Sequence, residues 1–181
     1  MIDEIKKYDL NFNESVFINK VGIIFIKLLD SIMYKDISII DHYANDQVCS
    51  YINVLIEEYK IKRITRLFDE ANIKSSRIID FKFENNKYII KVELISRFMD
   101  YFIDEDNGSY VGGINDHRIE KIHIITFEKD VNTIDLGILI KCPTCGNSIN
   151  PNENGLCTFC KNIIPMEKYD YILTDIDTFK N

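Results

Sequence analysis

The sequence predicts an α+β fold, in which N-terminal helices pack on one face of a curved antiparallel sheet and a small cysteine-bearing unit follows. Three observations predict this. Apolar residues recur at three- and four-residue steps before position 60, they alternate with polar residues after position 78, and four of the five cysteines lie within residues 142–160. Helices followed by a run of strands favour segregated layers over an alternating α/β sheet.

The first long helix has a recognisable start. Asn11 and Asn13 are candidate N-caps, and Glu14 follows Asn11 by three residues, as in a capping box. Its apolar positions form one helical face: Phe17, Val21, Ile24, Phe25, Leu28 and Ile32. A short second helix is expected over residues 36–43 and a third over residues 46–59.

Strands are expected from position 79 onward. Ile79, Phe81 and Phe83 should face the helices, whereas Asp80, Lys82 and Glu84 should face water or a partner. A turn at 85–86 leads into a second alternating strand that continues to Ile103, and so long a strand is expected to be curved or bulged. An Asn-Gly turn within 106–109 precedes a further strand within 118–128.

Composition restricts the class of protein. The 181 residues are 46% hydrophobic and 28% charged, which predicts a packed globule. The net charge of -7 argues against a general nucleic-acid binder, which needs a basic surface to neutralise phosphates. The apolar run Val21–Ile26 ends at Lys27 and is too short to span a membrane. The acidic N-terminus lacks a signal-peptide pattern, so we expect a cytoplasmic protein, with a peripheral position at a membrane kept open.

Four cysteines form the most specific motif. Cys142 and Cys145 make one C-x-x-C pair, and Cys157 and Cys160 make a second, with eleven residues between the pairs. Each pair can bend so that both sulfurs point to one place, and four thiolates complete a tetrahedral, structural zinc site with no open position. The chain is expected to divide into a domain over residues 1–135 and a zinc ribbon over 136–181.

Other uses of these cysteines are less favoured. Two disulfides do not suit a cytoplasmic chain. A redox centre would place one C-x-x-C pair at the start of a helix, whereas here two matched pairs occur. An iron site with the same four ligands stays open as an alternative.

Further motifs follow one another along the chain. The N-terminal ones are Asp9-Leu10-Asn11-Phe12 with Phe17, then Asp100-Tyr101 with Asp104 and Gly108, then Ile125-Thr126-Phe127. The C-terminal ones are Cys142-Pro143-Thr144-Cys145-Gly146, Gly155-Leu156-Cys157 and a closing strand at Tyr169-Asp170-Tyr171-Ile172-Leu173. Together and in this order, they resemble the domain of the mitochondrial inner-membrane translocase subunit 44 and its bacterial relatives, to which a zinc ribbon is often appended. Ile125 stands where that family usually has Trp.

The resemblance implies a nuclear transport factor 2-like fold, in which a curved sheet and its helices form a cone around an apolar pocket. It also implies a non-enzymatic docking module, since the mitochondrial relative docks at the inner membrane and recruits the import motor. We therefore expect a module that binds a protein or an anionic lipid, with no catalytic residues.

A basic run follows the third predicted helix and is a candidate binding site. Lys60, Lys62, Arg63 and Arg66 either form a solvated helix end or contact anionic lipid or an acidic partner. Asp69 and Glu70 follow closely in the sequence and reduce the net positive charge of this stretch.

Two other function classes compete with the docking module. A zinc-ribbon adaptor for ribosome or RNA is disfavoured by the acidic balance. An enzyme would need a carboxylic acid or a tyrosine in the pocket, and Asp100, Tyr88 and Tyr101 are the loose candidates. The dispersed His42, His117 and His123 are expected to be surface or sheet residues, and Cys49 a buried small hydrophobe.

Overall fold

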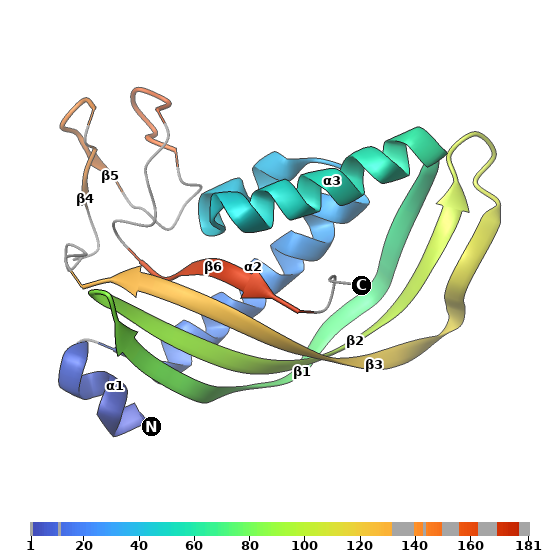
Figure 1. Ribbon diagram of the computed structural model, residues 1–181. Coiled ribbons are helices and arrows are strands. Elements are labelled where there is room, and N and C mark those ends of the chain that lie inside the picture. The colour runs from blue at the N-terminus through green and yellow to red at the C-terminus, as the bar shows by residue number, and fades with distance from the viewer. Residues whose placement is uncertain are drawn as a thin grey trace.

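Helices lie across a strongly curved sheet in the computed structural model, which describes residues 2–10, 12–131, 140–142, 144–149, 156–162 and 170–177 (Figure 1). The helices are α1 (Ile2–Tyr8), α2 (Glu14–Met33) and α3 (Asp46–Lys62), with 3₁₀ turns η1 (Ile37–Ile39) and η2 (Asp41–Tyr43) between the last two. The main strands are β1 (Ile64–Glu84), β2 (Lys87–Asp104), β3 (Tyr110–Asp130) and β6 (Ile172–Ile176), and β4 (Ile140–Lys141) pairs with β5 (Ser148–Ile149).

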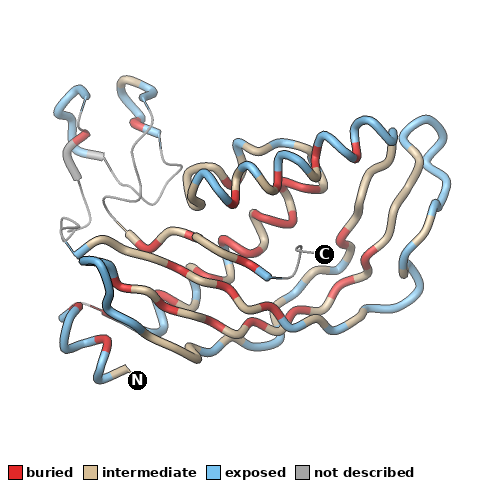
Figure 2. The backbone as a smooth tube through the Cα atoms, in the orientation of Figure 1, coloured by how far each residue is buried: buried red, intermediate tan, exposed pale blue. Residues whose placement is uncertain are grey.

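The predicted α+β class and the curved antiparallel sheet are confirmed. The four strands of the main sheet pair antiparallel in the order β1-β2-β3-β6. Apolar residues of α2 and α3 pack with the buried residues of β2 and β3 in one core. In Figure 2, buried positions alternate with less buried ones along the central strands.

β6 differs from the expectation that Tyr169–Leu173 would close the ribbon. It joins the main sheet instead, with Leu173 opposite Phe127 of β3. The physical reason is burial, because Leu173 and Ile176 are almost fully covered within the main core. Residues 132–139 lie outside the described part of the chain, so the division at 135/136 stays a prediction.

The helix starts follow the predicted capping chemistry. The Asn13 side chain accepts a hydrogen bond from the Val16 N–H at 3.2 Å, and the predicted apolar face of α2 is buried. Asn11 lies outside the described residues. The Asn45 side chain caps α3 in the same way, accepting from the Val48 N–H at 2.9 Å.

Two helical expectations were wrong or incomplete. Residues 36–43 form the two 3₁₀ turns rather than an α-helix. The segment breaks at Ile40, whose side chain is fully buried, and the N–H groups of Ile40 and Tyr43 donate to carbonyls three residues back, as in a 3₁₀ helix. The short helix α1 was not predicted.

β1 begins at Ile64, well before the predicted position 79, and three register shifts explain why its pattern is obscured. Phe81 and Phe83 lie on the helix face, opposite Ile90 and Tyr88, as predicted. Ile79 does not follow the pattern. It lies in the bulge between Ile78 and Asp80, and Ile78 packs on the core in its place.

β2 confirms the alternating pattern, because every second side chain from Tyr88 to Asp100 is buried. Both predicted turns are present. Asn85 and Asn86 have φ of 52° and 60°, and Gly108 has φ of 70°, the left-handed values that these residue types accept. β3 is longer at both ends than the predicted 118–128.

Candidate metal centre and binding surfaces

Each C-x-x-C pair lies on a tight backbone knuckle, and the two knuckles have matching hydrogen bonds. In the first, the Gly146 N–H donates to the Cys142 carbonyl at 2.9 Å. In the second, the Lys161 N–H donates to the Cys157 carbonyl at 2.9 Å. Gly146 and Lys161 both have positive φ, 72° and 62°. Only glycine adopts this conformation without cost, so the second knuckle carries local strain at a lysine.

The knuckles bring the four predicted ligand sulfurs together. All four Sγ atoms lie within 4.8 Å of one another, with Cys142 to Cys160 at 3.7 Å and Cys145 to Cys157 at 3.6 Å. These separations exceed a disulfide bond of about 2.05 Å. They match the edge of a tetrahedron with metal–sulfur bonds of about 2.3 Å, which is about 3.8 Å. The cluster can therefore hold a metal ion.

The thiols of the cluster do not titrate alike, since the pKa of Cys142 is lowered and that of Cys160 is raised to about 12. A backbone hydrogen bond from Cys145 is the main cause that lowers the pKa of Cys142 to about 6. Cys49 differs. It is half-buried on α3, and burial with the nearby Asp41 and Asp46 raises the pKa of its thiol to about 11.

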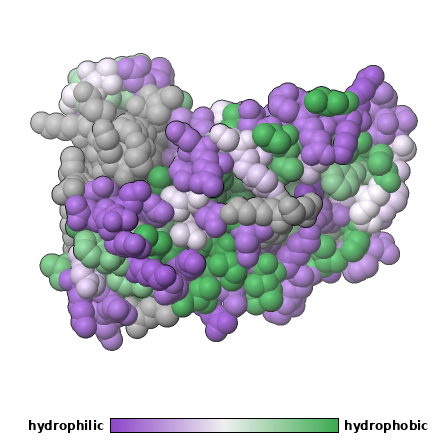
Figure 3. Space-filling view, in the orientation of Figure 1, coloured by the Kyte–Doolittle hydropathy of each residue, from purple (hydrophilic) through white to green (hydrophobic). Residues whose placement is uncertain are grey.

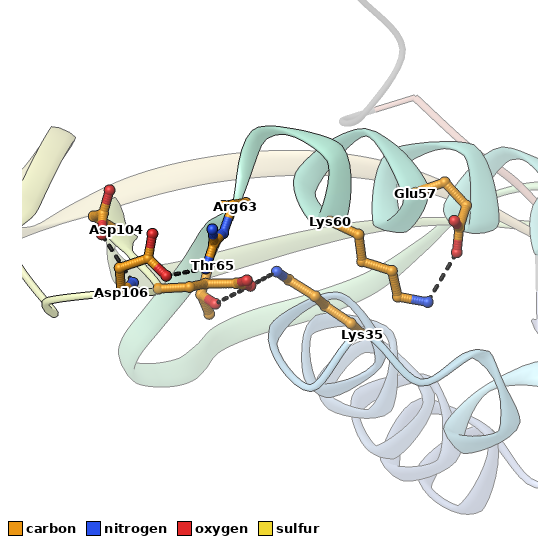
Figure 4. A network of polar contacts seen from close by, with 8 residues as sticks. Lys35, Glu57, Lys60, Arg63, Thr65, Asp104 and Asp106 are labelled. Atoms are coloured by element: carbon orange, nitrogen blue, oxygen red, sulfur yellow. Dashed lines mark hydrogen bonds and ion pairs between the residues drawn. The ribbon is translucent and has the colours of Figure 1, made fainter.

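The basic run does not form a single cationic patch. At the end of α3, Lys60 pairs with Glu57 at 2.8 Å, and Lys62 pairs with Glu58. Arg63 ends the helix with φ of 54° and pairs with Asp106. Figure 4 shows how Lys60, Arg63 and Lys35 lie beside carboxylates of the β2–β3 turn and of α3.

Arg66, the fourth residue of the run, lies apart from the others inside the fold. Its guanidinium contacts both carboxylate oxygens of Asp100, each at 2.8 Å, and lies 4.9 Å from the centre of the Phe68 ring. Asp100 also accepts from Lys121 at 2.7 Å. The Tyr59 hydroxyl accepts a further hydrogen bond from Arg66 at 3.2 Å. Sequence reasoning missed this network, because its members are far apart in the chain.

The three loose catalytic candidates are not brought together. Asp100 is committed to the ion pair just described. The Tyr88 hydroxyl donates to the backbone carbonyl of Tyr8 at 2.8 Å, and the Tyr101 hydroxyl donates to Asp69. Each contact links separate elements of the fold, which is the pattern of structural hydrogen bonds.

Two motifs of the resemblance meet in the fold. Asp9, from the first motif, lies 3.0 Å from the Lys129 ammonium of β3. The Tyr171 hydroxyl, from the last motif, donates to the same Asp9 oxygen at 3.3 Å. The two ends of the described chain are thus joined by one buried carboxylate.

His123 is a buried sheet histidine. Its Nε2 lies 2.6 Å from the Ser96 hydroxyl, and its ring lies 4.6 Å from that of Phe25 on α2. Burial lowers its pKa to about 4. His42 and His117 each lie beside the preceding aspartate instead, so the three histidines share no site.

Two of the grooves on the outer surface, both lined by described residues, bear on docking. One, of about 620 Å³, lies between α2 and β1. The other, of about 460 Å³, lies along α3 beside Val54 and Ile61. On the face seen in Figure 3, hydrophobic residues also gather over the sheet below α3. Among the described residues, no helix is long and apolar enough to cross a membrane.

The helices, the curved sheet and the cysteine cluster define the class: a nuclear transport factor 2-like α+β domain with a four-cysteine site. The chain belongs to the Tim44-like domain family, whose model matches residues 1–137. Domains of this family are generally non-catalytic and bind proteins and membrane surfaces. No curated protein matches the chain.

Proposed function

We propose that this protein is a non-enzymatic docking module for a protein partner, with one structural zinc ion holding its C-terminal cysteine knuckles. The observation that carries the proposal is the assignment of the family over residues 1–137 together with the closed cysteine cluster. We expect it to act in the cytoplasm.

Zinc is supported by the ligand set. Four thiolates in a tetrahedron suit zinc, and they leave no position for a reactive water. Such a site contributes to folding rather than to hydrolysis. Iron with four cysteines has similar geometry, so elemental analysis decides between the two metals.

The absence of a catalytic role is supported by the contacts of the candidate groups. Asp100, Tyr88 and Tyr101 are each held in a structural hydrogen bond or ion pair. Reactive groups are usually gathered in one cleft with tuned pKa values. Asp100 and Tyr101 instead link β2 to β1, and Tyr88 links β2 to α1.

A protein partner is favoured over an anionic lipid by the charge at the basic run. Lys60, Lys62 and Arg63 each have a carboxylate neighbour. Asp104 adds a further carboxylate that caps the adjacent turn, accepting from the Asp106 N–H at 2.9 Å. Attraction to anionic headgroups needs unneutralised cations. An adaptor for ribosome or RNA is disfavoured for the same reason, since the whole chain carries a net charge of -7.

The test is cross-linked affinity capture of the full chain from its native cell, with a Cys142→Ser, Cys160→Ser variant beside the wild type. We expect a protein to be recovered reproducibly and small-molecule turnover to be undetectable. Turnover that Tyr101→Phe abolishes without loss of fold would contradict the proposal. Recovery of an anionic lipid in place of a protein would keep the docking function but would show that the partner is a lipid.

A further inference from the structure

β1 offers an open sheet edge. It is the outer strand of the four-stranded sheet, and within the described residues it pairs with β2 alone. Over residues 70–77 most of its side chains are exposed. The backbone groups on the outer side of such a strand can accept another strand.

An apolar groove runs beside this edge. The groove between α2 and β1 has a volume of about 620 Å³, and its apolar lining includes Ile18, Ile23, Ile26 and Ile73. Gly22 lets α2 approach β1 closely, because a Cβ atom there would lie 2.9 Å from Ile73 Cδ1. The groove can therefore take side chains of a segment that lies along β1.

The charged residues of the groove are basic. Lys27 and Lys74 line it, and no lining residue is acidic. Lys74 shares the carboxylate of Glu120 with Arg97, at 2.8 and 3.0 Å, so two cations compete for one anion. Lys27 lies 5.2 Å from the centre of the Tyr43 ring and interacts with Asp30. Arg97, Glu120 and Asp30 lie outside the groove, so within the lining itself the two lysines leave a surplus of positive charge.

We infer that this groove binds an extended, acidic segment of a partner protein, which adds as a strand to the β1 edge and places alternate apolar side chains against α2. The inference rests on the proposed docking function and names its partner by chemistry. Strand addition supplies affinity through the backbone, and pockets for alternate side chains supply specificity. The surplus of positive charge selects acidic residues at the positions between them.

The register of β1 limits the length of the added strand. Ser75–Ile78 pair regularly with β2, and register shifts at Ile73/Ser75 and Ile78/Asp80 bracket this stretch. Bulges protect an edge from indiscriminate pairing. The bound segment is therefore short, and the groove contacts must supply much of its affinity.

A displayed library of random 12-residue peptides, selected on the full zinc-loaded chain, tests the inference. We expect selected peptides to alternate apolar and acidic residues. A synthetic copy of the strongest clone should shift the backbone amide signals of Ser75–Ile78. Its Kd should rise about tenfold or more in Ile23→Asp, and likewise in Lys27→Glu, Lys74→Glu.

The matched control is Val54→Asp, which places the same charge in the groove of α3. Val54 is 66% exposed and Ile23 is 49% exposed, so neither variant should unfold the chain. The control should leave the Kd within about twofold. Selection of no peptides, of basic peptides, or of peptides indifferent to the α2–β1 variants overturns the inference. If a captured cellular partner still binds those variants, the docking function stands and only this surface is wrong.

Discussion

Arg66 of β1 and Asp100 of β2 form a two-point ion pair in the interior of the fold, with Nε and Nη2 of the arginine each 2.8 Å from a carboxylate oxygen. Burial alone would raise the pKa of Asp100, but hydrogen bonds from Arg66 and Lys121 outweigh it and lower that pKa. The side chain of Asp100 is only 8% exposed. The pair therefore differs from the exposed ion pairs that surround the sheet.

Asp100→Asn should lower the free energy of unfolding by about 3–5 kcal/mol, because it leaves Arg66 and Lys121 without their carboxylate. The measurement is urea denaturation at pH 7. Glu120→Gln is the control, since Glu120 pairs with exposed partners, and it should cost less than about 1 kcal/mol. Similar small losses in both variants would show that the Asp100 pair is not buried as described.

Stability should fall as the pH drops below about 6.5, because His123 is neutral in the fold with a pKa of about 4. In the unfolded chain this histidine takes up a proton near pH 6.5, whereas in the folded chain it does not. Acid therefore lowers the free energy of the unfolded state relative to the folded state. This contribution is complete above pH 6.5 and falls by up to about 3 kcal/mol as the pH approaches 4.

The check is denaturation of wild type and His123→Gln at pH 7.5, 6 and 5. The variant is less stable at neutral pH, because it repacks a buried site, but it should lose less stability on acidification. Parallel losses in the two proteins would mean that other groups cause the acid sensitivity.

Purified protein should contain about one zinc per chain, because the four sulfurs form one closed site. Cys142→Ser or Cys160→Ser should remove the metal and unfold the two knuckles. Cys49→Ser is the matched control, since Cys49 lies apart on α3 and should leave the zinc content unchanged. Elemental analysis measures the metal. Iron in its place, or folded knuckles without metal, would contradict the zinc assignment.

In the same variants, the amide signals of β1–β3 should stay dispersed, because the core of the sheet does not use the cysteines. The amide signals of β6 are followed separately, because β6 comes after the knuckles in the sequence and yet pairs with β3 of the main sheet. Loss of dispersion throughout the sheet would mean that the metal site and the sheet fold as one unit.

Charge reversal of the basic run should not change sedimentation with vesicles. Lys62 and Arg63 already pair with Glu58 and Asp106, so a Lys62→Glu, Arg63→Glu variant should behave like the wild type with vesicles of phosphatidylglycerol or cardiolipin. The assay compares low and high salt, because headgroup attraction weakens with salt. Salt-sensitive binding that the variant loses would assign this surface to lipid.

The class of fold was predictable because its signals are local. Asn13 and Asn45 cap their helices through contacts within three residues. The alternation of β2 follows from the two-residue period of a strand with one buried face. The four cysteines were predictable as one site because each C-x-x-C pair bends within its own knuckle.

Neither the start nor the register of β1 was predictable in the same way. Register shifts interrupt its two-residue period, so Ile78 rather than Ile79 reaches the core. The helix predicted over 36–43 failed because the chain breaks at the buried Ile40 into two short 3₁₀ turns. In both segments, packing in the folded chain outweighs an average propensity.

Local chemistry in the sequence therefore determined the helix caps, the alternating strands, both turns and the candidate metal ligands. Tertiary structure decided which distant residues meet. It placed Arg66 against Asp100, joined Asp9 to Tyr171, and added β6 to the sheet. The reason is physical: a buried charge or a sheet edge can be satisfied by any suitable partner in the chain, and only the folded path of the backbone selects which one is near enough.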